Sequence, residues 1–237
     1  MESPVVENYL KKIYALQAGE KPLGTTVLGR ELRVSPPSAD QMVKRMIHQG
    51  FVTRARDRGI RLTPVGKRAA LRLIRKYRIA ECMLVGLLGL DWKTAYEEAC
   101  KSEHVLSDEV EARISAVLHD PRTCPHGHPI PDRDGVVEED EAVPLGAMHE
   151  GAGVVIVRVR EEKSDLLEHL DAMGMAPGRT LEVDQIAPFG DSMLVRIDGA
   201  AFALGREITE NVWVRDRSMA TVSPTGYRSE PERLRHS

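Results

Sequence analysis

Residues 35–62 read SPPSADQMVKRMIHQGFVTRARDRGIRL, and this stretch decides the fold of the N-terminal part of the chain. Ser35-Pro36 predicts the start of a helix over residues 38–48, because the serine side chain can cap the first turn and proline fits there. Gln49-Gly50 ends that helix. Two short alternating runs, 51–53 and 59–62, are joined by a basic segment and predict a β-hairpin.

Two further helices precede this stretch. Ser3-Pro4 predicts a helix start, and apolar residues between Val6 and Leu16 follow at helical spacing. A short helix begins at Thr25 or Thr26 and ends at a tight turn at Arg33-Val34. Helix, short helix, turn, helix and basic hairpin is the order of a winged helix-turn-helix, in which the second helix of the pair enters the major groove of DNA.

The predicted second helix and hairpin offer side chains suited to DNA. Gln41 can pair with adenine, whereas lysine and arginine side chains suit phosphates. The candidate DNA-binding residues are Ser35, Pro37, Ser38, Gln41, Lys44, Arg45, Arg54, Arg56 and Arg58. Each of them alone could be an ordinary solvated side chain, and a winged helix used for protein contacts is the main alternative for the whole set.

The charge distribution supports a polyanion-binding module. Residues 1–70 contain 13 Lys+Arg and 6 Asp+Glu, a balance of +7, although the whole chain carries 33 Lys+Arg and 36 Asp+Glu. The remaining residues therefore carry 20 basic and 30 acidic side chains, a balance of −10. A basic N-terminal third on an acidic protein indicates a nucleic-acid-binding part joined to something else.

Three helices are predicted after the hairpin, and the second carries ligand-type residues. They span about 65–88, 92–106 and 108–118, with Asp91 and Ser107 as caps. Cys100, Glu103 and His104 stand at i, i+3 and i+4, on one helix face. A thiolate, a carboxylate and an imidazole together suit a first-row transition metal, although an acidic helix with a buried cysteine is the simpler reading. These helices are too apolar to stand alone, which predicts mutual packing and a homodimer.

The C-terminal half changes character twice. Cys124, His126 and His128 alternate with prolines and a glycine; they could hold zinc, but the spacing lacks a second ligand pair and favours a stiff turn. Residues 132–147 are acidic and show neither helical nor strand periodicity, which predicts a linker. From Gly151 short strands separated by glycine turns, with one short helix at 164–173, predict a small antiparallel β-barrel. Residues 217–237 predict a flexible tail.

The composition bounds the class of protein. The chain has 237 residues and only three cysteines, which favours about two domains in a reducing compartment. No apolar run reaches the roughly 18 residues of a membrane span, and the N-terminus has no secretory pattern. We expect a cytoplasmic protein with no membrane partner and no small-molecule substrate.

Several segments together resemble the diphtheria-toxin-repressor and manganese-transport-regulator family of metal-dependent repressors. The resemblance covers about residues 4–131 and rests on ENYLKKIY at 7–14, VSPPS at 34–38, RLTPVG at 61–66, EACKSEHVLS at 98–107 and CPHGHPIP at 124–131. Residues 148–216, with LDAMGMAPG at 170–178 and APFG at 187–190, look like the FeoA-type barrel of many members. The implied fold class is multi-domain α+β: a winged helix-turn-helix at 1–70, an all-α dimerisation domain at 71–131, the 132–147 linker and a small β-barrel at 148–216.

The resemblance implies two metal sites and a function. The main site would use Asn8, Cys100, Glu103 and His104, although the family usually has methionine or aspartate where Asn8 stands. Cysteine at position 100 resembles the iron-responsive branch and softens the site towards Fe2+ over Mn2+. A second site would use Glu81 with Asp165 and Glu168, but Tyr77 and Tyr96 stand where the family has histidines.

We therefore expect a homodimeric repressor that binds double-stranded operator DNA when loaded with Fe2+ or Mn2+ and controls metal-homeostasis genes. Two alternatives remain open at this point. One is a metal-independent winged-helix DNA-binding protein with a structural ion. The other is a metalloenzyme, in which an ion held by cysteine, glutamate and histidine activates water.

Overall fold

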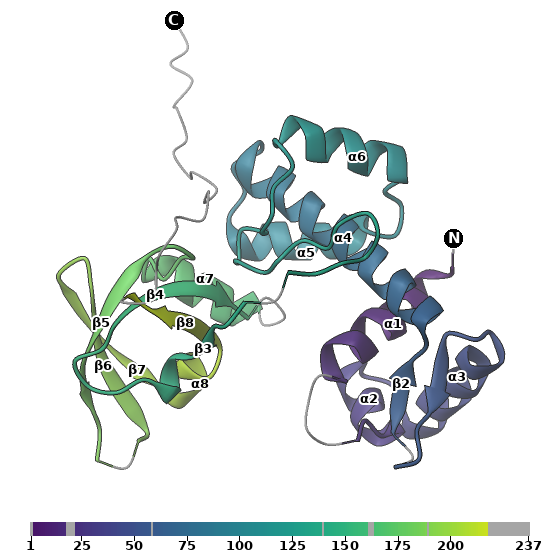
Figure 1. Ribbon diagram of the computed structural model, residues 1–237, viewed down its shortest axis with the longest axis horizontal. Helices are drawn as coiled ribbons and strands as arrows, with labels where there is room; N and C mark the ends of the chain where they lie inside the picture. Colours follow the sequence, from purple (N-terminus) through teal and green to yellow (C-terminus); the bar gives the residue numbers. More distant parts are fainter. Residues whose placement is uncertain are drawn as a thin grey trace, which may run out of the picture. The chain divides into compact units, whose positions relative to one another are not determined.

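The computed structural model describes residues 2–17, 22–57, 59–138, 140–160, 164–188 and 190–217. It forms two compact units, one built from residues 1–77, 102–106 and 131–137 and the other from 78–101, 107–130 and 138–237. Figure 1 labels the elements in chain order. They are α1 (Pro4–Leu16), α2 (Thr25–Glu31), α3 (Pro36–His48), β1 (Val52–Arg54), β2 (Ile60–Leu62), α4 (Pro64–Gly86), α5 (Trp92–Ser102), α6 (Asp108–Val117), β3 (Val143–Pro144), the 3-10 helix η1 (Leu145–Ala147), β4 (Gly153–Val159), α7 (Ser164–Ala172), β5 (Thr180–Ile186), β6 (Ser192–Ile197), β7 (Ala200–Gly205), α8 (Arg206–Thr209) and β8 (Val212–Asp216).

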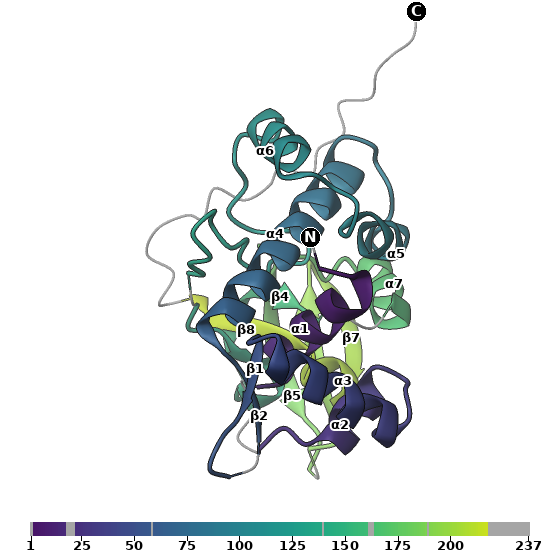
Figure 2. The same cartoon turned by 90° about the vertical axis from the view of Figure 1, so that its right-hand side faces the viewer.

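The first unit has the predicted winged helix-turn-helix. Ser35 caps α3 by accepting a hydrogen bond from the Ser38 amide at 3.3 Å, as the Ser-Pro sequence predicts. β1 and β2 pair antiparallel, with Thr53 opposite Arg61, and Figure 2 shows this hairpin with α3. The core of the unit consists of apolar side chains from α1, α2, α3, the hairpin, the start of α4 and the segments before α2 and β1: Val6, Tyr9, Leu10, Ile13, Leu23, Leu28, Val43, Met46, Phe51, Val52, Ile60 and Ala70.

The helices of the second unit follow the predicted caps, with one difference. Asp91 accepts from the Thr94 amide at 2.9 Å at the start of α5, and Ser107 caps α6. The α5 helix ends at Ser102, so Glu103 and His104 lie in the turn after the helix and not on its face. The amides of residues 105 and 106 both bond to the Ser102 carbonyl, which turns the chain before the next cap.

The C-terminal part is a six-stranded antiparallel sheet with strand order β3-β8-β4-β5-β6-β7. Within the described residues β3 and β7 are its two ends, so the hydrogen-bonded sheet is open and not the closed barrel expected. The segment expected to be only a linker contributes β3, where Val143 pairs with Val214, and buries Leu145 completely. Because Leu145 is a single buried residue after an acidic stretch, it produces no alternation of apolar and polar residues, and the sequence pattern therefore does not predict this strand.

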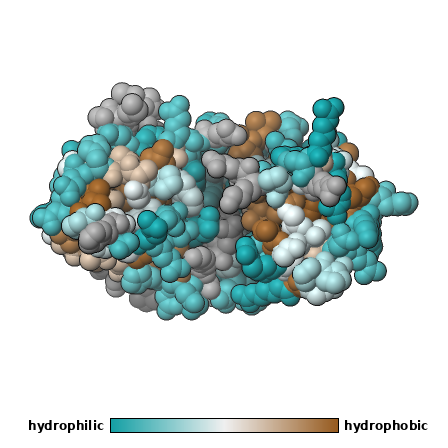
Figure 3. Space-filling model, turned by 90° about the horizontal axis from the view of Figure 1, so that it is seen from below, coloured by the Kyte–Doolittle hydropathy of each residue, from teal (hydrophilic) through white to brown (hydrophobic). Residues whose placement is uncertain are grey.

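The three-part α+β architecture is confirmed. The sheet and α7 enclose a second core that includes Val154, Ile156, Leu167, Leu170 and Val195, and Trp92 of α5 belongs to the same cluster. On the face shown in Figure 3 hydrophilic residues predominate and the apolar ones form scattered patches. Within the described ranges, none of the helices has the length and apolarity that crossing a bilayer requires.

Candidate metal centres and DNA-binding surface

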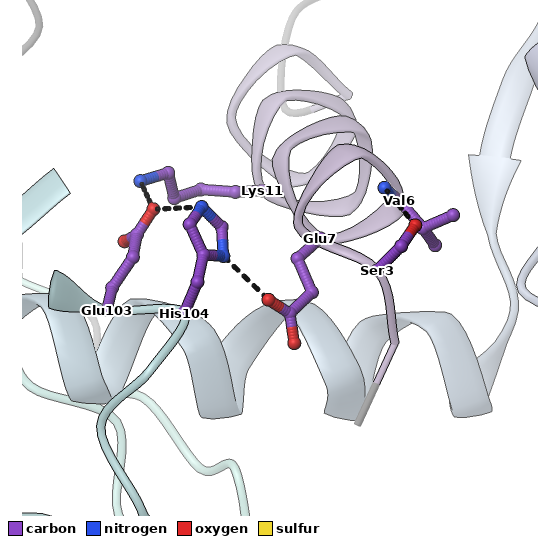
Figure 4. A network of polar contacts seen from close by, with 6 residues as sticks. All are labelled: Ser3, Val6, Glu7, Lys11, Glu103 and His104. Carbon is purple, nitrogen blue, oxygen red and sulfur yellow. Dashed lines mark hydrogen bonds and ion pairs between the residues drawn. The ribbon is translucent and has the colours of Figure 1, made fainter. Parts of the chain in front are cut away.

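The turn after α5 meets the first helix of the chain. The Lys11 ammonium lies 2.5 Å from a carboxylate oxygen of Glu103, whose side chain is only 1% exposed. The same ammonium stands 4.7 Å from the centre of the Tyr77 ring, a cation–π distance. Figure 4 shows Lys11 and Glu103 pointing towards each other from α1 and the turn. The Lys11 ammonium therefore supplies the positive charge beside the buried Glu103 carboxylate.

His104 makes the second contact between this turn and α1. Its Nδ1 lies 2.6 Å from Glu7 Oε2, and its Nε2 lies 3.5 Å from Glu103 Oε1 (Figure 4). Glu7 and Lys11 are i and i+4 on α1, so one face of the helix presents both an anion and a cation to the turn. Neither residue was predicted from the sequence. Their i, i+4 spacing next to Asn8 was the available signal.

Burial raises the pKa of Glu103, and the nearby Lys11 charge opposes that rise without cancelling it. A carboxylate buried to this degree is stable in its charged form only beside a positive group. A carboxylate and an imidazole with nitrogen and oxygen atoms 3.5 Å apart are also donors that a divalent ion accepts. On this evidence Glu103 and His104 fit a metal ion.

The remaining predicted ligands of the main site lie as follows. Asn8 follows Glu7 on α1 and is exposed. Cys100 lies in α5, three residues before Glu103; it forms no disulfide and is partly buried. The α1 residues that contact the turn are Glu7, which bonds to His104, and Lys11, which pairs with Glu103. Asn8 directly follows Glu7 and precedes Lys11 by three residues.

A second cluster of ligand-type residues lies inside the second unit. One ligand atom each from Glu81, Cys124 and His126 lie within 4.8 Å of one another, and all three side chains are buried. His126 Nδ1 is 3.2 Å from Glu81 Oε1, and the ring of Trp92 contacts the imidazole edge-on at a centroid distance of 5.0 Å. A thiol, an imidazole and a carboxylate without bulk water suit a borderline divalent metal such as Fe2+ or Zn2+.

The CPHG segment holds this cluster against the sheet. The amide of Val159 in β4 donates to the His126 carbonyl at 2.9 Å, and the Gly127 amide donates to the Cys124 carbonyl at 2.8 Å. Gly127 has a φ of +84°, and a Cβ there would stand 2.0 Å from the Val157 carbonyl oxygen. Only glycine allows this close approach of the loop to the strand. The stiff turn that the sequence predicts therefore positions two of the three ligands.

The other residues expected at the second site lie elsewhere in the same unit. Asp165 and Glu168 on α7 are exposed and face Lys93, whose ammonium is 2.8 Å from Glu168 and 3.8 Å from Asp165. The α7 carboxylate that interacts electrostatically with His126 is Asp171, whose pKa is raised by burial first and by Asp91 second. Asp171 was not predicted from the sequence, because nothing in its spacing sets it apart from other surface acids of α7.

Tyr77 and Tyr96 replace expected histidines, and each has a packing role. Tyr77 is buried under Lys11 in the first unit. Tyr96 packs against the sheet core of the second unit.

The residues predicted to contact DNA are mostly exposed on α3 and the hairpin. Gln41, Lys44 and Arg45 are exposed on α3, opposite its buried residues Ala39, Val43 and Met46. At the helix start the hydroxyls of Ser35 and Ser38 lie 2.8 Å apart, beside the exposed Pro37. Arg54 and Arg56 are exposed in and after β1. Arg58 lies outside the described residues.

Winged-helix DNA-reading elements joined to helices with buried metal-type ligands define a metal-linked DNA-binding protein. Comparison with known proteins agrees. Residues 1–60 match the model of the iron dependent repressor N-terminal DNA binding domain, residues 63–132 match the iron dependent repressor metal binding and dimerisation domain, and residues 143–216 match the FeoA domain.

Relatives and solved structures agree with these matches. The chain is 44% identical over 141 residues to the diphtheria toxin repressor of Corynebacterium diphtheriae, covering 58% of this chain and 62% of that protein. It is 34% identical over 203 residues to the iron-dependent repressor IdeR of Mycobacterium leprae, covering 80% and 87%. A solved manganese-dependent transcriptional repressor in complex with manganese superposes with a TM-score of 0.83 at 32% identity, covering 89% of this chain and 99% of that one.

This chain belongs to the iron-dependent repressor family, the family of the diphtheria toxin repressor. The resemblance read from the sequence is thereby confirmed. Members of the family are transcriptional repressors and not enzymes, so the metalloenzyme alternative is set aside. DNA-binding and dimerisation domains are both present.

Proposed function

We propose that this protein is a homodimeric transcriptional regulator that binds operator DNA when loaded with Fe2+ or Mn2+ and represses metal-homeostasis genes in the cytoplasm. The observation that carries the proposal is the contact of α1 with a buried carboxylate and an imidazole, through Lys11–Glu103 and Glu7–His104. The α1 helix belongs to the same apolar core as α3, so whatever fixes α1 also acts on the DNA-reading helix.

We propose Asn8, Cys100, Glu103 and His104 as the ligands of the co-repressor ion. The buried Glu103 and the adjacent His104 support this assignment, because their donors fit a divalent ion. A thiolate at Cys100 favours Fe2+ over Mn2+ by its softness. When bound, the ion would supply positive charge to the buried Glu103 carboxylate, and Asn8 of α1 would hold it together with the residues of the turn.

Two residues of α1, Lys11 and Glu7, affect how an ion could bind to Glu103 and His104. An ion would compete with the Lys11 ammonium for the Glu103 carboxylate, because that ammonium lies 2.5 Å from Oε1. Glu7 orients the His104 ring through Nδ1 and leaves Nε2 towards Glu103. A carboxylate that orients a ligating histidine is a common device in metal proteins. Residues Glu103 and His104 would therefore hold an ion better in one arrangement of α1 than in another, which is the requirement for a switch.

We also propose a second ion at Glu81, Cys124 and His126. The three buried ligand atoms within 4.8 Å of one another support it, and so does the acidic Asp171 close to His126. Asp165 and Glu168, the carboxylates inferred from the family pattern, take part only if they leave Lys93. Because this cluster ties α4 to the CPHG segment, we assign the second ion a structural role in the helical part.

The dimer and the DNA contacts follow from the same family pattern. Exposed apolar side chains directly after α4 (Leu87 and Leu88) and on α6 (Val110 and Val117) support a homodimer interface. The proposed domain boundaries are 1–70 for DNA binding, 71–131 for dimerisation and metal binding and 148–216 for the FeoA-type domain, and the connecting residues 132–147 also contribute β3 and Leu145 to the sheet of that last domain. The proposed DNA contacts are Ser35, Pro37, Ser38, Gln41, Lys44, Arg45, Arg54, Arg56 and Arg58.

The test is a DNA-binding titration of the full chain under anaerobic conditions. A duplex selected from a random pool is titrated with protein in the presence of Fe2+, Mn2+ or Zn2+, and with a chelator as control. We expect tight sequence-specific binding with Fe2+ or Mn2+ and its loss with the chelator. Operator affinity that the chelator leaves unchanged would instead identify a metal-independent winged-helix protein.

A further inference from the structure

The DNA-reading helix carries one acidic residue, and it stands among the residues proposed to contact DNA. In the α3 sequence PPSADQMVKRMIH the only carboxylate is Asp40. Pro37 and Lys44 are three residues before and four residues after it, so all three share one strip of the helix. The next residue, Gln41, is exposed, whereas Ala39 and Val43 are buried. A negative charge here is unexpected, because DNA phosphates repel it.

Asp40 holds two cations, one on each of its carboxylate oxygens. Oδ2 lies 2.8 Å from the Lys44 ammonium on the same helix, and Oδ1 lies 2.9 Å from the Arg54 guanidinium of β1. One carboxylate therefore bridges α3 and the hairpin. The pKa of Asp40 is held below its usual value, first by the hydrogen bond from Lys44. Its side chain is 34% exposed, so it stands at the surface and not in the core.

These pairs are weak enough to be exchanged. Exposed ion pairs contribute little to stability, because water screens them and long side chains lose freedom in them. Phosphates of a bound duplex offer Lys44 and Arg54 stronger partners. Once these cations turn to phosphates, both oxygens of Asp40 become free acceptors at the helix surface that enters the groove.

A free carboxylate reads only some base edges. In the major groove cytosine presents its N4 amino group, which donates, whereas guanine presents two acceptors and thymine presents an acceptor and a methyl group. A carboxylate accepts from cytosine and is repelled by guanine and thymine edges. Adenine offers one donor beside an acceptor, which a carboxylate matches less well than the amide of Gln41 does.

We propose that Asp40 determines the sequence specificity of this protein, by accepting a hydrogen bond from a cytosine amino group in the major groove. The proposal rests on the operator binding proposed above. Asp40 is acidic, so it does not belong to the basic residues expected to contact DNA phosphates. The proposal explains why an acid is placed on a helix whose other charged groups are cations.

The test is a comparison of base preferences between the metal-loaded full chain and two variants, Asp40→Asn and Asp40→Ala. Each protein selects duplexes from a random pool, and its affinity is then measured for the wild-type site and for versions with each single base pair replaced. Glu210→Gln serves as the matched control, because it removes an i,i+4 ion pair with Arg206 on α8, far from α3 in the sequence. Thermal unfolding and metal affinity check that each variant keeps its fold.

We expect the wild type and Glu210→Gln to prefer cytosine at one position of each half-site by roughly tenfold. Asp40→Ala should lose that preference, and Asp40→Asn should lose it or shift it to adenine. Identical base preferences in all four proteins would overturn the proposal. A change in affinity by the same factor on every duplex would also overturn it, because that result assigns Asp40 a purely electrostatic role. If the wild type shows no sequence-specific, metal-dependent binding at all, the proposed function fails and not merely the role of Asp40.

Discussion

Lys11 and Glu103 are 92 positions apart in the chain, yet the ammonium of one lies 2.5 Å from the carboxylate of the other. Glu103 is 1% exposed and Lys11 is 26% exposed, so the pair joins a buried anion to a cation that can still reach water. The contact gives the metal-free protein a built-in counter-ion at the proposed metal centre. We expect the metal response to depend on how easily this ammonium is displaced.

Removal of the Lys11 charge tests this competition. In Lys11→Met the side chain keeps most of its apolar length but no longer neutralises Glu103, so an ion meets one competitor fewer. Because a hydrogen bond to a charged group contributes about 1.5–3 kcal/mol, we expect metal affinity to rise by about tenfold. Isothermal titration with Mn2+ measures it, with Lys12→Met as control. A weaker affinity than that of the wild type would show that Lys11 supports the site and does not compete for it.

Loss of a proposed ligand should uncouple DNA binding from metal. We expect Cys100→Ala and His104→Ala each to abolish metal-dependent operator binding, because each removes a donor of the co-repressor ion. Fluorescence anisotropy with a labelled duplex, with and without Fe2+, measures the effect. Cys82→Ala, a buried cysteine outside both clusters, is the control and should respond as the wild type does. A full metal response in both ligand variants would remove Cys100 and His104 from the mechanism.

Metal stoichiometry tests the second cluster. We expect Cys124→Ser and Glu81→Gln to bind one ion fewer per chain, because each removes a donor from a group of three. With Co2+ as a spectroscopic probe, Cys124→Ser should also lose the part of the thiolate-to-metal absorption that comes from this site. The double variant Asp165→Asn/Glu168→Gln is the comparison. Loss of the ion in this double variant alone would assign the site to the exposed carboxylates of α7.

The buried Glu103 predicts a pH dependence of stability in the metal-free protein. Since its folded pKa is raised above the usual value, the native state holds its proton to higher pH than the unfolded state does. Stability should therefore fall as the pH rises from the usual carboxyl pKa through the raised one. Glu103→Gln cannot titrate and should lack this part of the slope. Urea unfolding of both proteins at several pH values measures the difference, and equal slopes would contradict it.

Substitution of Gly127, in the loop that carries Cys124 and His126, should lower the free energy of unfolding. Gly127→Ala would place a Cβ 2.0 Å from the Val157 carbonyl, at a positive φ. We expect a loss of about 2 kcal/mol or more in unfolding free energy, and a weaker second ion. Gly174→Ala is the matched control, since Gly174 has a φ of +68° but nothing within 4 Å of an added Cβ. A similar cost in both variants would show that φ strain alone matters.

The sequence by itself determined the elements and their order. Local signals are enough for this, because a serine cap, a proline in the first turn or an alternation of apolar residues acts within a few residues. The caps at Ser35, Asp91 and Ser107 lie where they were predicted. The family also followed from the sequence, because its motifs are short and contiguous.

Only the tertiary structure decided which side chains meet. Lys11 and Glu7 reach the turn at residues 103–104 because the first unit includes both segments, and no local period announces a contact across more than 90 residues. Likewise Glu81 joins Cys124 and His126 because β4 holds the CPHG loop. Asp40 faces Arg54 because the hairpin folds back on α3. Contacts between distant segments depend on packing, which is a property of the whole fold.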